Sequence, residues 1–211
     1  MLKIRMVFVF LCCMLTMQAQ YPGYKAVADL SRFKEVFTSM AKSIQTIKSD
    51  FVQEKELSLL SEKIVSKGKF WFKKENKVRM EYQQPFQYLM VINQDNIYIK
   101  DGQKENKISS RSNKLFQQIN KITVDCIQGT VLNNPEYKII VFENNQVFLI
   151  ELSPSAKALR EFFKNINIFV SKKDYSVDKL ELHEQSGDKT VISYVNKELN
   201  TTLPDALFTI K

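Results

Sequence analysis

The stretch Gly68-Lys69-Phe70-Trp71-Phe72-Lys73-Lys74-Glu75-Asn76-Lys77-Val78-Arg79-Met80-Glu81-Tyr82, followed by Pro85, decides the fold. It predicts two strands joined by a polar turn. In the second strand three apolar residues alternate with three charged ones: Val78, Met80 and Tyr82 against Lys77, Arg79 and Glu81. Successive side chains of a strand point to opposite faces of its sheet. The sheet therefore has an apolar, aromatic face and a charged face, and the function depends on what the apolar face contacts.

The first 20 residues have the organisation of a secretory signal peptide. Lys3 and Arg5 precede an apolar run that extends from residue 6 to residue 17, and the small residue Ala19 follows it. This arrangement is typical of an export signal, and the run is shorter than the roughly 20 apolar residues that span a bilayer. We therefore expect cleavage near Ala19 or Gln20, and an exported mature chain that forms one domain over residues 21–211.

Cysteine and histidine usage argues against metal and nucleophilic chemistry. Removal of the signal leaves Cys126 as the only cysteine, so the mature chain cannot form an intramolecular disulfide. His183 is the only histidine, and we expect it on the charged face of a strand with Lys179 and Glu181. The sequence contains no Gly-x-Ser-x-Gly motif and no cluster with metal-ligand spacing. It predicts a protein that is not an enzyme, with no catalytic residues, no metal and no cofactor.

The net charge of +8 includes two units from the signal. Export argues against nucleic acid as a partner, although a basic protein would otherwise suggest it. The lysines are spread over turns and outward strand positions, as is typical of a solvated face. The alternative is that these lysines attract the protein to an anionic surface, such as lipid head groups or an acidic partner protein.

Hydrophobic spacing predicts a helix, a run of strands, a second helix and further strands. The first helix carries apolar residues at intervals of three and four from Leu30 to Ile47, with Asp29 or Ser31 as its N-cap. The second begins near Ser112 or Asn113, and its segment ends at Asn133-Asn134-Pro135. The expected strands are 48–57, 64–73, 77–83, 87–93, 96–101, a short one around Ile108, 137–143, 146–152, 162–171, 177–185, 189–196 and 207–210.

This order predicts a mostly β fold with helices, in which one strongly curved antiparallel sheet has an α-helical lid on its concave face. The apolar sides of the strands would line that face. Such alternation is ordinarily the packed core beneath the helices. Because the inward residues are rich in Phe, Met and Tyr, and Met adapts to ligands of variable shape, a cavity for an apolar ligand is the alternative.

The sequence resembles the LolA family of periplasmic carriers, which move lipoproteins from the inner to the outer membrane of Gram-negative bacteria. The resemblance spans nearly all of the mature chain. It is carried by Asp50-Phe51-Val52-Gln53-Glu54, the opening stretch with Pro85, residues 159–170 and 177–195, and the ending Pro204-Asp205-Ala206-Leu207-Phe208-Thr209-Ile210. It implies an incomplete, unclosed antiparallel β-barrel, a periplasmic location and the binding of lipoprotein acyl chains in the apolar concavity without chemistry. The alternatives are a carrier of another lipid or glycolipid on the same fold, and a non-carrier envelope adaptor protein.

The resemblance also implies site residues and partners. It places the acyl-chain lining at Val78, Met80 and Tyr82, and face alternation extends the lining to Phe51, Phe70 and Phe72. The family has an arginine followed by a proline after the second strand, and that arginine helps to hold the lid closed through hydrogen bonds; this chain has Lys74-Glu75 there. Lysine lacks the planar fork of arginine, so a lid latch at Lys74 would be weak. The implied partners are acylated lipoproteins, an inner-membrane lipoprotein-releasing transporter and an outer-membrane acceptor, and we expect a monomer.

Overall fold

The computed structural model describes residues 21–60, 62–74, 76–94, 96–101, 104–109 and 114–209, with the backbone alone between 101 and 120. The expected signal peptide of residues 1–20, the helix start at Ser112 or Asn113, and Ile210 lie outside these residues. The helices are α1 (Leu30–Ser43), α2 (Lys114–Gln128) and α3 (Lys157–Arg160), with short 3₁₀ helices η1 (Thr130–Asn133) and η2 (Asp205–Phe208). The strands are β1 (Lys25–Ala26), β2 (Thr46–Leu57), β3 (Glu62–Lys73), β4 (Lys77–Gln84), β5 (Tyr88–Asn93), β6 (Asn96–Asp101), β7 (Lys104–Ser109), β8 (Tyr137–Glu143), β9 (Val147–Pro154), β10 (Phe163–Ser171), β11 (Val177–Glu184) and β12 (Lys189–Leu199).

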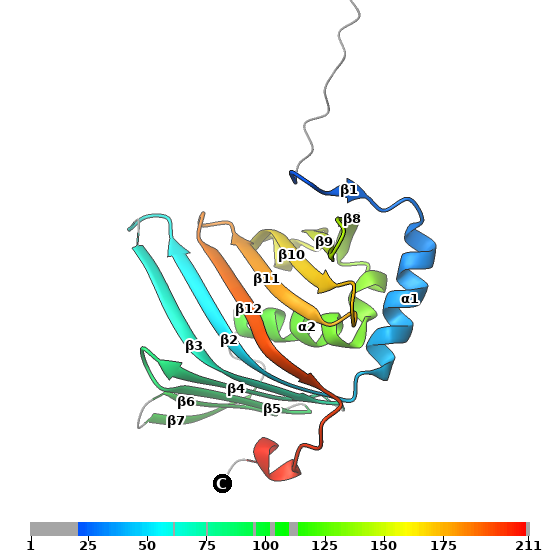
Figure 1. Ribbon diagram of the computed structural model, residues 1–211. Coiled ribbons are helices and arrows are strands. Elements are labelled where there is room, and N and C mark those ends of the chain that lie inside the picture. Colours follow the sequence, from blue (N-terminus) through cyan, green and yellow to red (C-terminus); the bar gives the residue numbers. More distant parts are fainter. Residues whose placement is uncertain are drawn as a thin grey trace, which may run out of the picture.

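The strands form one antiparallel sheet of 12 strands in the order β1-β8-β9-β10-β11-β12-β2-β3-β4-β5-β6-β7. The sheet is strongly curved, and α2 lies within the curve while α1 stands beside one end of it (Figure 1). In the described part of the chain the outermost strands β1 and β7 do not pair with each other, so the curved sheet is not closed into a barrel. This architecture confirms the expected fold class.

The hairpin expected in the opening stretch is formed by β3 and β4. Its register pairs Phe70 with Met80 and Phe72 with Val78, so these four side chains share the concave face. Phe72 and Val78 are buried, with exposed fractions of 0% and 2%. The apolar face predicted by alternation is therefore the inner face of the sheet.

The first helix begins where the sequence predicts, but ends earlier. The side chain of Asp29 caps α1 by accepting a hydrogen bond of 2.9 Å from the backbone N–H of Arg32. The prediction that the helical stripe continues to Ile47 is wrong. Ile44 already has an extended backbone, and Ile47 lies in β2 opposite Phe72. A spacing of three residues fits the helix, but strand pairing with β3 satisfies the backbone groups from Thr46 onward.

The second helix, α2, ends at Gln128 and is followed by Gly129, which has a left-handed backbone with φ of 73°. Glycine adopts this conformation without the steric cost that other residues have, and it is a common helix stop. The helical segment then continues as η1 up to Asn133, close to the predicted end at Pro135. The sequence thus located the helical segment, but not the break within it.

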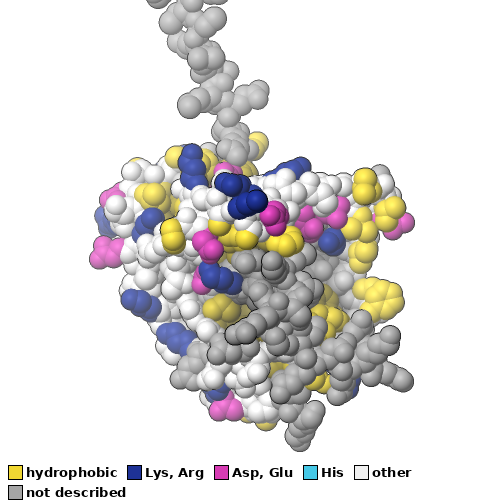
Figure 2. Space-filling view, turned by 180° about the vertical axis from the view of Figure 1, so that it is seen from behind, with side chains coloured by type: hydrophobic (Ala, Val, Ile, Leu, Met, Phe, Trp, Pro, Cys, Tyr) yellow, Lys and Arg dark blue, Asp and Glu magenta, His cyan; other side chains and the backbone are white. Residues whose placement is uncertain are grey.

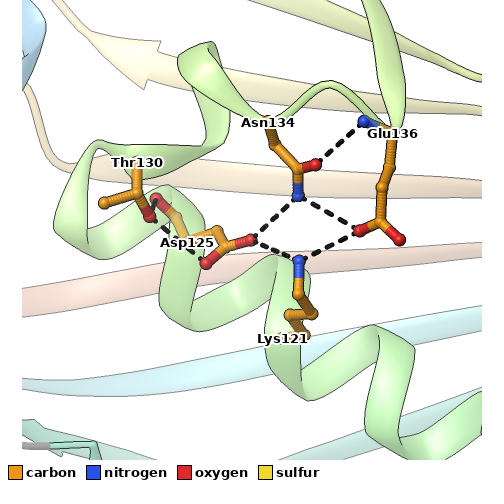
Figure 3. A network of polar contacts seen from close by, with 5 residues as sticks. All are labelled: Lys121, Asp125, Thr130, Asn134 and Glu136. Atoms are coloured by element: carbon orange, nitrogen blue, oxygen red, sulfur yellow. Dashed lines mark hydrogen bonds and ion pairs between the residues drawn. The ribbon is translucent and has the colours of Figure 1, made fainter.

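A polar network connects the C-terminal half of α2 to η1 and to the segment that precedes β8 (Figure 3). The ammonium of Lys121 lies 3.2 Å from carboxylate oxygens of both Asp125 and Glu136. The hydroxyl of Thr130 donates to Asp125 at 3.2 Å, and the side-chain amide of Asn134 donates to Asp125 at 3.4 Å and to Glu136 at 3.5 Å. The network joins residues of α2, of η1 and of the short segment between η1 and β8, so it holds this end of the lid against the chain that leads into the sheet.

The C-terminal segment corrects a second prediction. Residues 207–208 were expected to begin a final strand, but Asp205–Phe208 form η2. The carboxylate of Asp205 lies 2.9 Å and 3.0 Å from the ammonium groups of Lys73 and Lys77, and the carbonyl of Phe208 accepts from Asn93 at 3.2 Å. Because β3 and β4 already pair on both sides, the segment cannot join them as a strand. It packs as a helical turn that buries Phe208.

The outer face of β11 and β12 carries a charged cluster around Glu181. Its carboxylate lies 2.7 Å from the ammonium of Lys179, 3.6 Å from Nε2 of His183 and 3.8 Å from the ammonium of Lys189. These neighbours lower the pKa of Glu181 from 4.5 to about 2, and His183 makes the largest contribution, followed by Lys179. This placement confirms the expected position of His183 beside Lys179 and Glu181.

The lowered pKa makes the stability of the fold sensitive to acid. A carboxylate whose pKa is lower in the folded than in the unfolded state stabilises the fold above the unfolded value, and this contribution disappears as the pH falls through the folded value. Replacing Glu181 with glutamine should therefore reduce the free energy of unfolding at pH 7 and flatten its pH dependence between about 4.5 and 2. Urea unfolding across this range measures both effects, and an unchanged pH profile would contradict the assignment.

Candidate ligand-binding cavity

A cavity of about 220 Å³ lies between the concave face of the sheet and α2. Six strands and the helix supply its walls. The lining residues are Gln53 and Lys55 of β2, Phe70 of β3, Val78, Met80 and Tyr82 of β4, Tyr88, Met90 and Ile92 of β5, Leu182 and Glu184 of β11, Thr190, Ile192 and Tyr194 of β12, and Thr123 of α2. Most of these side chains are apolar or aromatic, so the cavity suits a hydrocarbon ligand.

The predicted lining residues divide into two groups. Phe70, Val78, Met80 and Tyr82 line the cavity, and their role in acyl-chain binding stays a prediction. Phe51 and Phe72 face the same side of the sheet, but neither lines the cavity. The ring of Phe51 packs edge to face on Tyr82 at 4.9 Å, and Phe72 is fully buried in the core. These two residues therefore support the wall rather than form it.

Sequence reasoning missed the wall that β5 provides. Tyr88, Met90 and Ile92 alternate along this strand and line the cavity beside β4. Period-two alternation within 87–93 could have revealed them, since they repeat the pattern of Val78, Met80 and Tyr82.

A smaller apolar cavity of about 20 Å³ adjoins the first. Phe70, Thr123 and Tyr194 line both. The rings of Phe70 and Tyr194 lie 5.1 Å apart in an edge-to-face arrangement. Cys126 lines the smaller cavity, and burial raises the pKa of its thiol well above the ordinary value. Cys126 is thus a buried apolar side chain rather than a reactive group.

Tyr82 and Tyr194, two tyrosines of the inner wall, favour their uncharged forms. The hydroxyl of Tyr82 donates to the side-chain carbonyl oxygen of Gln53 at 2.9 Å, and burial raises the pKa of Tyr82. Burial likewise raises the pKa of Tyr194. Within the described ranges, no group of three or more His, Cys, Asp and Glu side chains is arranged to hold a metal ion. In the same part of the chain, none of the helices is both long and apolar enough to cross a membrane.

The turn between β3 and β4 contacts both helices. The ammonium of Lys74, the residue expected at the lid latch, donates to the carbonyl of Lys42 in the last turn of α1. A cation there is favoured by the helix dipole. Asn76 accepts a hydrogen bond of 2.7 Å from the side-chain amide of Gln128, the last residue of α2. Lys74 therefore contacts α1, and it is Asn76 that connects this turn to α2.

Exposed apolar side chains gather at the end of the sheet where β2 ends and β3 begins. Leu59 is 92% exposed and Leu60 63%, and Phe86, in the turn after β4, is 77% exposed. Figure 2 shows hydrophobic side chains along the right-hand edge of that view, where this end of the sheet lies. The cavity extends toward the same end, since Lys55 and Glu184 lie near the ends of β2 and β11.

A curved, unclosed antiparallel sheet that holds an apolar cavity beneath a helix defines a class of half-barrel proteins. Residues 42–211 match the family model described as outer membrane lipoprotein carrier protein LolA, and the chain belongs to this family. The expected family resemblance is thereby confirmed. The comparison with curated proteins finds no match.

Solved structures from several proteins resemble this chain. A crystal structure of MucB has a TM-score of 0.51 at 10% identity, over 86% of this chain and 64% of that one. A LolA superfamily protein from Nitrosomonas europaea has a TM-score of 0.45 at 10% identity, over 84% and 97%. The lipoprotein LppX from Mycobacterium tuberculosis has a TM-score of 0.42 at 9% identity, over 82% and 96%. Identities of about 10% can show the fold alone. Of these three structures, MucB supports the fold of this chain, because its TM-score, 0.51, is above one half.

Proposed function

We propose that this protein is a periplasmic carrier that binds the acyl chains of lipoproteins and moves them from the inner to the outer membrane. The observation that carries the proposal is the apolar cavity between the concave face and α2. Membership of the LolA family supports the cargo and the location. On this proposal the chain receives its cargo from an inner-membrane transporter and passes it to an outer-membrane acceptor, without chemistry.

The size of the cavity bears on how a carrier could release its cargo. Burying a sixteen-carbon acyl chain yields roughly 12 kcal/mol in total, at about 0.8 kcal/mol per methylene. Ligand pockets usually measure about 300–1,000 Å³, and this cavity measures about 220 Å³. Full occupancy therefore requires the cavity to enlarge, and the cost of that change lowers the net affinity. Transfer to a second apolar site is then nearly neutral in free energy.

Met80 offers a direct test. Its side chain is 7% exposed and lines the cavity, so replacing it with glutamate introduces a carboxylate where the hydrocarbon would lie. Desolvating this charge costs several kcal/mol. We therefore expect the amount of acylated protein that the variant retains to fall by a factor of about ten or more. The measurement is mass spectrometry of the ligand that remains bound after native purification from the periplasm of a lipoprotein-producing host.

Lys69→Glu is the matched control, because Lys69 is exposed on the opposite face of the neighbouring strand. Circular dichroism verifies that both variants are folded. Normal retention of triacylated protein by a folded Met80→Glu variant would contradict the proposed site. Free lipid or glycolipid bound to the original chain would indicate a carrier of another lipid, and no bound ligand would favour an adaptor protein.

A further inference from the structure

The inner faces of three neighbouring strands change from apolar to polar at the same end of the cavity. Along β2, Phe51 is followed on the same face by Gln53 and Lys55. Along β12, Ile192 gives way to Thr190, which pairs with Lys55. Along β11, Leu182 gives way to Glu184. The cavity therefore has an apolar interior and a polar end.

Hydrogen bonds and an ion pair connect the polar side chains at this end. The ammonium of Lys55 lies 3.3 Å from Oε1 of Glu184, and the hydroxyl of Thr190 lies 3.4 Å from the same oxygen. Across β3, the hydroxyl of Tyr82 in β4 donates to Oε1 of Gln53 in β2. We call the five residues Gln53, Lys55, Tyr82, Glu184 and Thr190 the polar collar, and all five line the cavity.

The charges of the polar collar cancel. Lys55 and Glu184 carry opposite charges and form an ion pair, and the other three side chains are neutral at pH 7. The side chain of Glu184 is only 18% exposed and already neutralises Lys55, so an anionic ligand group would lose hydration here without gaining an unpaired cation. A neutral carbonyl brings no such penalty, and the amide nitrogen of Gln53 is a suitable donor for it.

We infer that the polar collar binds the neutral ester or amide group that joins an acyl chain to its cargo, while the chain occupies the apolar interior. This inference rests on the proposed function and deepens it, since it names the chemical group that the cavity distinguishes. The collar thereby selects an acyl chain in ester or amide linkage against the free fatty acid anion, although both carry the same hydrocarbon.

The experiment compares two probes with the same sixteen-carbon chain, the neutral ester 1-monopalmitoylglycerol and the anion palmitate. Binding to the delipidated mature chain is measured by calorimetry at pH 7. We expect the ester to bind at least about tenfold more tightly, because the palmitate carboxylate loses hydration beside the Lys55–Glu184 pair, whereas the ester is uncharged. Replacing Gln53 with leucine should weaken ester binding by about five- to tenfold and leave palmitate binding unchanged.

Replacing Glu184 with glutamine provides the decisive variant. It removes the negative charge and leaves the ammonium of Lys55 without its carboxylate partner, so palmitate affinity should rise by about tenfold while ester affinity changes little. Glu56→Gln is the matched control, since Glu56 is an exposed carboxylate on the other face of β2 and should alter neither affinity.

The outcomes separate this inference from the proposed function. If the original chain binds both probes equally and Glu184→Gln leaves their ratio unchanged, the collar does not select the linkage, while acyl-chain binding still stands. If the original chain binds neither probe, acyl-chain binding itself fails, and the inference fails with it.

Discussion

Replacing Gly68 with alanine should lower the free energy of unfolding by about 3 kcal/mol or more, or prevent folding altogether. Gly68 is the first residue of the opening stretch, at a point where β3 passes between Phe51 of β2 and Tyr82 of β4. A Cβ atom there would lie 2.1 Å from the carbonyl oxygen of Glu81 and 2.7 Å from the ring of Phe51. Both distances are far below van der Waals contact.

Relaxation around the added methyl group would be costly, because the closest atom belongs to the backbone. The carbonyl of Glu81 belongs to the β3–β4 pair, so it cannot move away without disturbing that ladder. The ring of Phe51 could rotate only by losing its contact with Tyr82, which lines the cavity. Gly68 therefore maintains both the hairpin and one wall of the cavity.

The measurement is urea unfolding of Gly68→Ala beside Ser66→Ala. Ser66 lies two residues earlier on the same strand and face, and its replacement removes one hydroxyl without adding volume, so it should change the free energy of unfolding by less than about 0.5 kcal/mol. Equal stabilities of the two variants would show that β3 and β4 do not approach each other in this register.

Alternation within the opening stretch was sufficient to predict the hairpin and its apolar face. It was not sufficient to separate cavity wall from core. Phe72 and Met80 have the same inward orientation, but Phe72 is fully buried in the core while Met80 borders the cavity. Alternation determines which face a side chain occupies. Its depth depends on the register with neighbouring strands and on the helix above, and both arise from long-range pairing.

The polar collar illustrates the same limit. The sequence shows Gln53 and Lys55 after Phe51, and Glu184 after Leu182, but nothing local indicates that they meet. Only the pairing of β12 with β2 and β11 brings Lys55, Thr190 and Glu184 to one end of the cavity. Similarly, residues 207–208 have strand-like composition, yet η2 forms there because the neighbouring strands β3 and β4 are already paired on both sides.

The second large effect concerns the contact between the end of α2 and α1. Replacing Gly129 with alanine should lower the free energy of unfolding by about 2–4 kcal/mol. Part of this arises from its left-handed backbone, which disfavours a Cβ atom by about 1–2 kcal/mol. The rest comes from close packing. The new Cβ would lie 2.8 Å from Cβ of Ala41 and 3.1 Å from Cα of Thr38, both in α1. The two helices would have to separate at this contact.

Gly23→Ala distinguishes the two contributions, because Gly23 is also left-handed, with φ of 81°, but no atom lies within 4 Å of its added Cβ. It should therefore show the backbone cost alone, and the difference between the two variants measures the contact between α1 and the end of α2. Urea unfolding gives both values. If they were equal, α1 would not support α2 at Gly129. A larger loss at Gly129, with faster amide hydrogen exchange in α2, would establish that the lid is anchored through its C-terminal end on α1.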